Sequence, residues 1–170
     1  ITKKLPADSY HDVGFKTICT NPCGEIPLSA YDSCRLISMN LKHLVKNPFE
    51  ENAGFDFKEL KRMTAIGMRL SDDLVEMEIE KLERIINVCD TADEVQLWTN
   101  LVKACVNGRR TGLGTHGLAD AIARLNLRYD SDEAIEVIEK IYETIRDTAY
   151  MESSRLAQER GSFPVFDWAK

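Results

Sequence analysis

Residues 20–28 read Thr-Asn-Pro-Cys-Gly-Glu-Ile-Pro-Leu, and they are the most informative stretch of the chain. Two prolines and a glycine keep this stretch out of a helix or a central strand, so Cys23 is predicted on a constrained turn. Asn21 and Glu25 stand two residues before and after that cysteine. Because residues two apart face the same side of an extended segment, an amide, a thiol and a carboxylate are expected to converge on one small ligand.

The pairing of Cys23 with a nearby carboxylate limits the chemistry of the thiol. A carboxylate raises the pKa of a neighbouring thiol and disfavours the thiolate that a nucleophilic cysteine needs. A cysteine-protease-like site also needs a histidine close to the thiol. The stretch therefore favours hydrogen-atom chemistry, which uses a protonated thiol, over nucleophilic catalysis.

Composition narrows the class of protein. The 170 residues include 22 basic and 28 acidic side chains, a net charge of −6, and 44% are hydrophobic. One domain with an apolar core is expected, and wholesale disorder is excluded. No apolar run reaches the roughly 18 residues of a membrane span, and the acidic balance argues against binding to a nucleic-acid backbone. Five cysteines without a signal-peptide core predict reduced thiols in a cytoplasmic protein.

The chain changes character after its first 48 residues, which hold four of the five prolines and read as loops and short extended segments. Three capping signals follow, each with a Glu three residues after the cap: Asp56-Phe-Lys-Glu59, Thr91-Ala-Asp-Glu94 and Asp130-Ser-Asp-Glu133. They predict a helix over Phe57–Met77, a short amphipathic piece after it, a helix ending at Gly108 and a long helix over about 132–160. The apolar stripe expected on the first helix is Leu60, Met63, Ile66 or Gly67, Leu70 and Leu74.

Residues 110–118 read Arg-Thr-Gly-Leu-Gly-Thr-His-Gly-Leu and predict a tight glycine-rich turn before another helix. The glycines match the letters of a dinucleotide fingerprint, but no apolar strand precedes them, so a nicotinamide or flavin site is not favoured. A close backbone crossing explains the glycines more simply. Few strands and long amphipathic helices together favour an α/β arrangement that is part of a larger sheet or barrel.

Three motifs in order give the chain a family resemblance. They are Asn21-Pro-Cys-Gly-Glu25 with a second cysteine, Cys34, before Asn40-Leu41; Arg109-Arg-Thr-Gly-Leu-Gly114; and Ala157-Gln-Glu-Arg-Gly-Ser-Phe-Pro164. From about Thr20 to Phe166 the chain resembles the catalytic barrel of ribonucleotide reductases. The prolines and glycine of the first motif are closest to the class II enzymes, which depend on adenosylcobalamin.

The resemblance implies the fold and the domain organisation. The chain is expected to be the central part of a ten-stranded α/β barrel, helix-rich in this segment. Residues 1–48 would supply the active-site loop and short strands. Residues 49–170 would supply helices with a glycine-rich βα turn at 110–118.

The resemblance also implies roles for four residues. Cys23 would carry the thiyl radical that removes the ribose 3′ hydrogen, and Glu25 would take the 3′-hydroxyl proton. Asn21 would hold the ribose hydroxyls. Cys34 would be one of two cysteines that supply the reducing equivalents and end as a disulfide. The product would be a 2′-deoxyribonucleotide for DNA synthesis.

The chain departs from the family pattern in ways that bear on its partners. Arg35 and Ile37 stand where the family usually has Asn and Gly, and Arg35 is expected either to lower the pKa of the neighbouring thiol or to point to solvent. The second redox cysteine would lie upstream, and the phosphate loop and reducing cysteines downstream. Alone, the chain is expected to be inactive, and it would need companion chains or segments, a ribonucleotide, and a thioredoxin-type or dithiol reductant.

Alternatives remain open. A class I catalytic subunit would take its radical from a separate metal-containing subunit, although that class usually carries Leu where this chain has Pro22. A non-catalytic helical interaction domain would leave the cysteines unreactive. A zinc site at Cys19 and Cys23 lacks a second ligand pair, so no metal ligands are assigned. The remaining residues have simple interpretations: Cys89 and Cys105 as core residues, the acidic run from Asp72 to Glu80 as a solvated face, and His116 as a helix-start or surface residue.

Overall fold

The structure is a computed structural model, and it describes residues 13–22, 24 and 26–166. The chain divides into two compact units. The first unit comprises Ile1–Arg35, Asp72–Thr111 and Gly161–Lys170, and the second comprises Leu36–Ser71 and Gly112–Arg160. Each unit is described by itself below.

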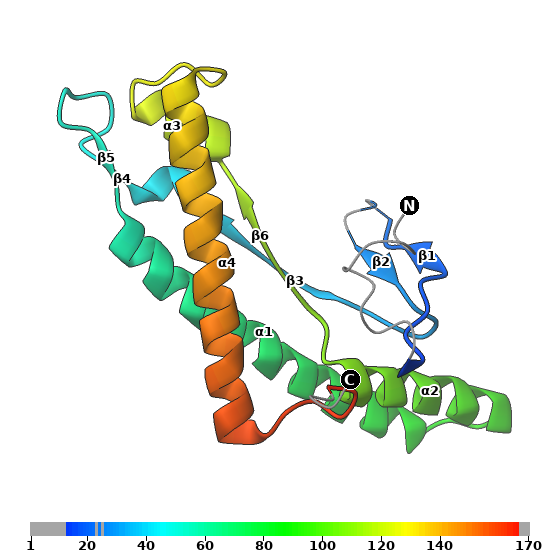
Figure 1. The fold of residues 1–170 in the computed structure, drawn as a ribbon. Coiled ribbons are helices and arrows are strands. Elements are labelled where there is room, and N and C mark those ends of the chain that lie inside the picture. Colours follow the sequence, from blue (N-terminus) through cyan, green and yellow to red (C-terminus); the bar gives the residue numbers. More distant parts are fainter. Residues whose placement is uncertain (1–12, 23, 25, 167–170) are drawn as a thin grey trace. The chain divides into compact units, whose positions relative to one another are not determined.

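The first unit contains a small hairpin and a capped helix. Strands β1 (Cys19–Thr20) and β2 (Pro27–Leu28) pair antiparallel, with Cys19 opposite Leu28 (Figure 1). Helix α2 (Ala92–Gly108) ends at the predicted glycine. Its start is the predicted capping box: the Thr91 side chain accepts from the Glu94 amide, and the Glu94 carboxylate accepts from the Thr91 amide.

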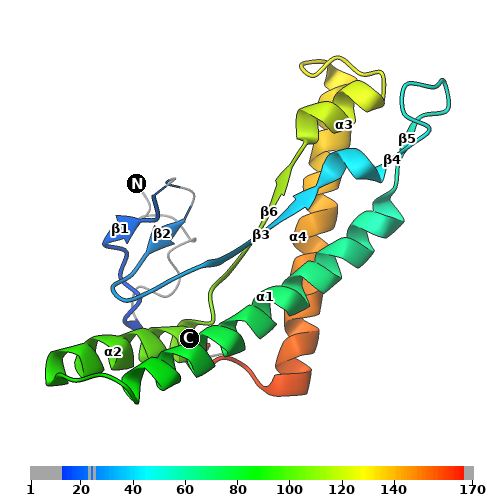
Figure 2. The ribbon, with the colours of Figure 1, turned by 180° about the vertical axis from the view of Figure 1, so that it is seen from behind.

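The second unit contains a strand pair, helices and a second small hairpin. Strands β3 (Arg35–Asn40) and β6 (Thr111–His116) form a two-stranded sheet and run side by side in both ribbon views (Figures 1 and 2). A 3₁₀ helix, η4 (Leu41–Leu44), leads into the antiparallel pair β4 (Val45–Lys46) and β5 (Gly54–Phe55). Helices α3 (Leu118–Arg124) and α4 (Asp132–Arg160) complete the unit with the first half of α1 (Phe57–Ile86).

An apolar cluster holds the second unit together. Its buried members come from β3, η4, β4, α1, α3 and α4 and are Met39, Leu41, Leu44, Val45, Leu60, Ala121, Ile141 and Ile145. Partly buried side chains such as Phe57 and Leu113 pack against the cluster. At the edge, the Lys140 ammonium lies 4.7 Å from the centre of the Phe57 ring, so the lysine adds a cation–π contact. Apolar burial of this kind is the main stabilising contribution in the unit.

Helix α1 is longer than predicted. It runs unbroken for 30 residues from Phe57 to Ile86, whereas the sequence predicted a stop at Met77 and a separate amphipathic piece. That prediction was wrong because the residues after Met77 include no proline or glycine to end the helix. The Glu59 amide donates to the Asp56 carboxylate at 3.0 Å, so Asp56 caps the helix as predicted.

The buried face of α1 also differs from the predicted apolar stripe. Leu60 is fully buried as expected, but Ile66 and Leu70 are about half exposed. Of the predicted alternatives Ile66 and Gly67, it is Gly67 that is buried. Val75 and Leu82 are buried further along the helix, and Thr64 and Ser71 are buried as well, with no exposed surface. Each hydroxyl donates to the carbonyl four residues earlier, Leu60 or Gly67, at 2.8 Å. The burial of these two hydroxyls costs little free energy, because each is hydrogen-bonded to a carbonyl of its own helix.

The glycine-rich segment is a strand rather than a turn. Residues 111–116 form β6, and the turn into α3 is confined to Gly117. Gly117 has φ +72°, and a Cβ there would lie 2.8 Å from the Asn40 side-chain oxygen, so the predicted close crossing is confirmed at this glycine. At Gly114 the prediction was wrong, because the nearest atom to a Cβ, the Ile37 carbonyl oxygen, is at an ordinary 3.8 Å.

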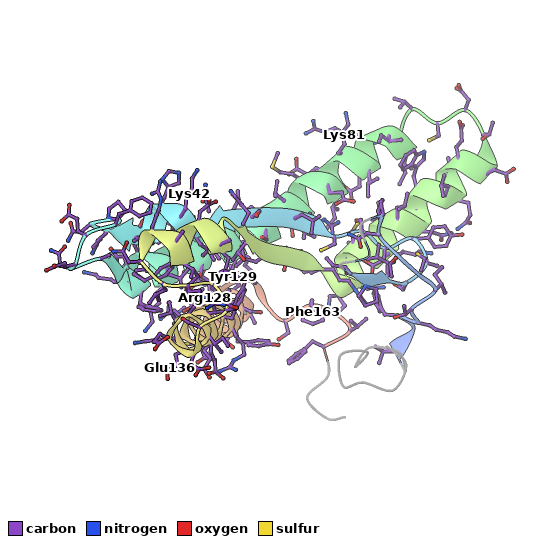
Figure 3. The ribbon with its side chains drawn as sticks, turned by 90° about the horizontal axis from the view of Figure 1, so that it is seen from above. Lys42, Lys81, Arg128, Tyr129, Glu136 and Phe163 are labelled. Atoms are coloured by element: carbon purple, nitrogen blue, oxygen red, sulfur yellow. The ribbon has the colours of Figure 1, made fainter. Side chains whose placement is uncertain are left out.

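Helix α4 has the predicted bounds, but its cap residue is one position later than predicted. Ser131, not Asp130, accepts a hydrogen bond from the Ala134 amide at 3.2 Å. Asp130 instead pairs with Arg128, which Figure 3 shows beside Tyr129 in the connection that leads into the helix. Two candidate cap residues in succession make such a shift easy, since serine and aspartate are similarly good caps. None of the helices in the described ranges is apolar enough over a sufficient length to cross a membrane.

Candidate active site

The loop between β1 and β2 carries the first sequence motif. The Asn21 amide donates to the Ile26 carbonyl, and the Ile26 amide donates to the Asn21 side-chain oxygen at 3.0 Å. A third bond joins the Gly24 amide to the Asn21 carbonyl. Asn21 therefore closes the loop through its backbone and its side-chain oxygen. The NH2 group of its side chain is the donor that a ribose-binding role would use.

Two predicted site residues, Cys23 and Glu25, lie outside the described residues. Their neighbour Gly24 has φ +77°, a left-handed conformation that glycine adopts without strain. The loop is therefore a turn at this point, which agrees with the constrained turn predicted from the prolines. Residues two apart share a side only in an extended segment, and Gly24 is not extended. The convergence of Asn21, Cys23 and Glu25 therefore stays a prediction.

Arg110 links this hairpin to the segment that carries the second cysteine. Its guanidinium donates to the Pro27 carbonyl at 2.9 Å and pairs with the Asp32 carboxylate at 2.8 Å. The Asp32 side chain is almost fully buried, at 1% exposed, and also accepts from the Ser29 hydroxyl and the Ser33 amide. The guanidinium further lies over the ring of Phe15, 5.7 Å from its centre. One side chain thus brings the strand after the Cys23 loop together with the residues just before Cys34.

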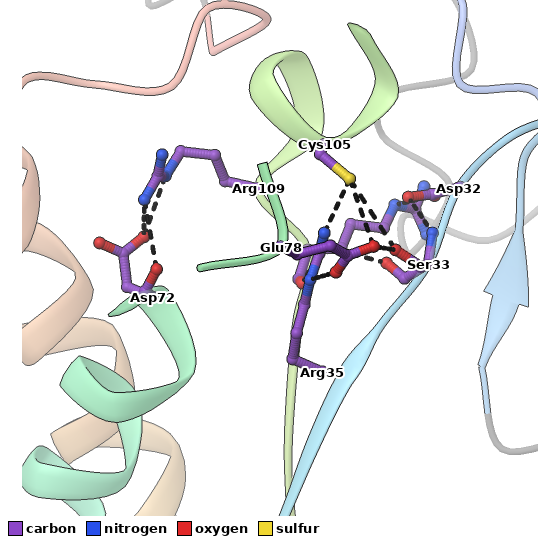
Figure 4. Close-up of polar contacts among 8 residues, drawn as sticks. Asp32, Ser33, Arg35, Asp72, Glu78, Cys105 and Arg109 are labelled. Atoms are coloured by element: carbon purple, nitrogen blue, oxygen red, sulfur yellow. Dashed lines mark hydrogen bonds and ion pairs between the residues drawn. The ribbon is translucent and has the colours of Figure 1, made fainter. Parts of the chain in front are cut away.

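A second polar cluster lies directly after Cys34, which is half-buried. The Arg35 guanidinium is buried and faces Glu78 on α1, with Nε 2.5 Å from the carboxylate oxygen, and Cys105 on α2, whose sulfur is 2.8 Å away (Figure 4). The Ser33 hydroxyl donates to Glu78 at 2.9 Å. Arg35 also donates to the carbonyls of Ser33 and Arg110. We call Ser33, Arg35, Glu78 and Cys105 the Arg35 cluster.

The Arg35 cluster corrects two interpretations of the sequence. Of the two alternatives for Arg35, exposure to solvent is wrong, because the side chain is only 7% exposed. The guanidinium donates to the Cys105 sulfur. Cys105 is buried as predicted, at 1% exposed, but it is not an ordinary core residue, since its thiol also lies 3.6 Å from Glu78.

Burial raises the pKa of the Cys105 thiol above its ordinary value, and the opposing charge of Arg35 does not cancel that effect. The thiol therefore stays protonated near neutral pH, and a protonated thiol can donate to the Glu78 carboxylate while its sulfur accepts from Arg35. The cluster is neutral in total, with one cation facing one anion. Such a buried pair fixes geometry more effectively than it adds stability.

The acidic run on α1 is not simply a solvated face. Figure 4 shows Arg109 paired with Asp72, at 2.8 Å, and Glu78 paired with Arg35. Arg109 also pairs with Glu76. Burial lowers the pKa of the Arg109 guanidinium, but the carboxylates of Asp72 and Glu76 together outweigh it and raise the pKa above its ordinary value. Arg109 ends α2 in a left-handed conformation, with φ +43° and ψ +45°. Three acids of the run therefore help to place the end of α2.

The other polar residues singled out from the sequence show no metal site. His116, on β6 of the second unit, shares a hydrogen bond of 2.8 Å with the Ser38 hydroxyl at an exposed position. Cys19 is exposed. Cys89 is half-buried and follows the end of α1, so it is not the core residue predicted, and its thiol donates to the Ile85 carbonyl. Among the described residues there is no group of three or more His, Cys, Asp or Glu side chains that could hold a metal ion.

Comparison with known protein families shows the family to which the chain belongs. Residues 10–170 match the family model described as "Ribonucleotide reductase, barrel domain". The chain belongs to the ribonucleotide reductase barrel-domain family. The resemblance stated from the three motifs is confirmed, and the helix-rich fold with its βα unit is a segment of that barrel type.

Individual reductases agree with the family assignment. The chain is 33% identical over 147 residues to the "Vitamin B12-dependent ribonucleoside-diphosphate reductase" of Mycobacterium tuberculosis, covering 86% of this chain and 18% of that protein. It is also 33% identical to the protein of that name from Thermoplasma acidophilum, over 100% of this chain and 19% of that protein. The "Ribonucleoside-diphosphate reductase subunit alpha" of Chlamydia pneumoniae is 30% identical over 89% of this chain and 13% of its own length. The chain thus spans less than a fifth of the length of these reductases.

Sequence reasoning missed Asp32, Glu78 and Arg110 as parts of the candidate site. Each is a charged residue in a stretch of many charged residues, and nothing local marks it as buried. The one available signal was the departure from the reductase pattern at Arg35, since a bulky cation at a position normally occupied by a small amide needs a partner. Glu78, on α1, and Arg110, between α2 and β6, are both distant in sequence from the motif, so only the fold brings them to it.

Proposed function

We propose that the protein to which this chain belongs converts ribonucleotides to 2′-deoxyribonucleotides by thiyl-radical chemistry. The observation that supports this most directly is the bridge made by Arg110. It connects the hairpin of the Asn-Pro-Cys-Gly-Glu motif to Asp32, two residues before Cys34. A reductase needs its radical thiol and its reducing thiols at one substrate, so a rigid connection between the two motifs suits the reaction.

In the proposed reaction, Cys23 and Glu25 act on the ribose. The Cys23 thiyl radical takes the 3′ hydrogen, and the Glu25 carboxylate takes the 3′-hydroxyl proton while the 2′-hydroxyl leaves as water. A positioned carboxylate typically contributes about 10²–10⁴-fold to such a proton transfer. Asn21 holds the ribose hydroxyls through its NH2 group, while its carbonyl groups keep the loop closed.

Cys34 and a second cysteine outside this chain supply the two electrons and two protons that the substrate gains. Two S–H bonds break, one S–S bond forms, and the 2′-oxygen leaves in water, so atoms and electrons balance. Cys23 then returns the 3′ hydrogen and is a radical again. A thioredoxin-type protein or a small dithiol reduces the disulfide before the next turnover.

Adenosylcobalamin is the proposed source of the radical, since two relatives carry vitamin B12 in their names. When bound, it would supply the radical that is passed to Cys23. The described residues of this chain offer no set of ligands or enclosing surface that fits it, and no step is assigned to them through the cofactor. A subunit that instead receives its radical from a separate metal-containing subunit is the second candidate, favoured by the name of the Chlamydia relative.

The fold proposal follows from the same family. We infer that the chain is the central part of a ten-stranded α/β barrel, in which residues 1–48 supply the active-site loop and short strands. Residues 49–170 supply helices around the βα unit formed by β6 and α3. Because the chain spans less than a fifth of its relatives, we expect the isolated chain to be inactive. Turnover by the isolated chain with adenosylcobalamin and a dithiol would contradict this.

The test is reduction of a ribonucleoside di- or triphosphate by the full-length protein with a dithiol, assayed with and without adenosylcobalamin. Cys23→Ser and Glu25→Gln are each expected to abolish deoxyribonucleotide formation. Cys34→Ser is expected to abolish turnover driven by the dithiol. Cys19→Ser is the matched control, since Cys19 lies on the same hairpin and has no proposed role. Full activity of Cys23→Ser would overturn the proposal, and activity that needs a second subunit but no cobalamin would favour the second candidate.

A further inference from the structure

We infer that Arg35 is a positioning residue for Cys34 and acts through the Arg35 cluster. The inference rests on the proposed function, because it assigns a task to the residue next to the proposed redox thiol. The Arg35 side chain is buried, and its guanidinium contacts both the Glu78 carboxylate and the Cys105 sulfur. The cluster therefore connects the strand start after Cys34 to α1 and α2.

The contacts on either side of Cys34 constrain its backbone. Before it, the Ser33 hydroxyl donates to Glu78 at 2.9 Å. After it, the Arg35 guanidinium faces the same carboxylate at 2.5 Å. The cluster thus holds Ser33 against α1 and Arg35 against α1 and α2, one on each side of Cys34 in the chain. Contacts on both sides restrict the positions that the Cys34 backbone can take.

A second anchor acts on the same short segment. Asp32 is held by Arg110, and the Arg35 guanidinium donates to the Arg110 carbonyl at 3.2 Å. The segment from Asp32 to Arg35 is therefore fixed by contacts from three other parts of the unit. Cys34 is the one residue of this segment that the proposed reaction uses.

This anchoring matters for disulfide chemistry. A disulfide forms only when the Cα atoms of the two cysteines lie within roughly 4.4–6.8 Å and the Cβ vectors are suitably directed. Misplacement by about 1 Å at a reacting group can cost on the order of 10²-fold in rate. A cysteine on an unanchored segment would meet its partner less often, so its disulfide would be easier to reduce and turnover would slow.

The double variant Arg35→Met/Glu78→Met tests the inference in the full-length protein. Replacing both members of a buried ion pair by apolar side chains is often neutral for stability, so the variant removes the anchor without leaving a lone buried charge. The matched control is Arg109→Met/Asp72→Met, which removes the other ion pair between the end of α2 and α1.

For the Arg35→Met/Glu78→Met variant we expect kcat with a dithiol to fall about tenfold or more while KM for the nucleotide stays within about twofold. We expect the equilibrium constant for the Cys34 disulfide to fall about tenfold, a rise of roughly 30 mV in its midpoint potential. The melting temperature should stay within about 4 °C of the unmodified protein. The control variant should leave the disulfide potential unchanged.

Three results would overturn the inference, and they can be told apart. An unchanged kcat and an unchanged disulfide potential in the Arg35→Met/Glu78→Met variant would show that the cluster does not position Cys34. An equal shift in the control variant would show that any loss of an ion pair in this unit has the same effect. If the unmodified protein forms no disulfide at Cys34 during turnover, the role proposed for Cys34 fails, and this inference fails with it.

Discussion

The two units of the chain are held by different kinds of contact. In the second unit, buried apolar side chains from strands and helices form one cluster around Leu60 and Ile141. In the first unit, ion pairs and hydrogen bonds of Arg35, Arg109 and Arg110 join segments that are far apart in the sequence. Apolar burial stabilises without fixing direction, whereas a buried ion pair fixes direction and adds little net stability.

The difference suits the proposed roles of the units. The candidate site residues Asn21 and Cys34 both belong to the first unit, on short segments that have little regular structure of their own. Directional contacts are what such segments need in order to present a side chain at one position. The second unit contributes a strand pair and helices whose packing does not depend on any single polar contact.

The largest expected effect is on the apolar cluster. Leu60→Ala and Ile141→Ala each remove a fully buried side chain and should each lower the free energy of unfolding by about 2–5 kcal/mol. Urea unfolding of the purified chain measures the loss. Ile135→Ala, on the same helix as Ile141 but 53% exposed, is the control and should change the value by no more than about 0.5 kcal/mol. Equal losses at Ile135 and Ile141 would contradict the claim that burial in the apolar cluster stabilises the second unit.

The next effect is at the Arg35 cluster. Glu78→Ala leaves the Arg35 guanidinium buried without its anion and should cost about 2 kcal/mol. Arg35→Met/Glu78→Met should cost less than the single change, because it leaves no buried charge behind. The same urea measurement on both variants decides the point. If the double variant loses more free energy of unfolding than Glu78→Ala, the ion pair itself stabilises the fold, and the two units differ less in how they are stabilised.

A smaller effect is expected at the start of α2. Thr91→Ala removes the hydroxyl that accepts from the Glu94 amide and should destabilise by about 1 kcal/mol. Thr91→Ser keeps a hydroxyl in place and should stay close to the original stability. Circular dichroism at increasing temperature measures both. A loss confined to Thr91→Ser, with Thr91→Ala unchanged, would mean that the capping box does not stabilise this helix.

The smallest effect concerns pH. The Lys46 ammonium, followed by the Glu59 amide, holds the pKa of Asp56 below its ordinary value of 3.8. A lowered pKa in the folded state means that this contribution to stability is present above pH 3.8 and is lost as the pH falls below it. Lys46→Met should therefore flatten the acid side of the stability profile slightly, as measured by urea unfolding between neutral and acidic pH. An unchanged profile would show that this exposed pair adds nothing.

Local sequence patterns predicted much of the helical structure. The bounds of α2 and α4 follow from capping residues and terminal glycines that act within one turn, so a window of a few residues contains the necessary information. The buried face of α1 did not follow, because Thr64 and Ser71 are polar by type and are buried only through bonds to their own helix. Strand β6 was not predicted, because closely spaced glycines indicate a turn. Only the pairing with β3 in the folded chain makes this segment a strand.

For the candidate site, the sequence by itself determined the family and the residues that carry the proposed chemistry, since Cys23, Glu25, Asn21 and Cys34 lie in motifs of contiguous residues. Only the tertiary structure decided the surroundings of Cys34. Arg35 is charged, and charge alone predicts exposure. It is buried because Glu78 and Cys105, 43 and 70 residues further along the chain, meet it through the packing of two helices. Such a partner set exists only in the folded chain, which is why no local pattern reveals it.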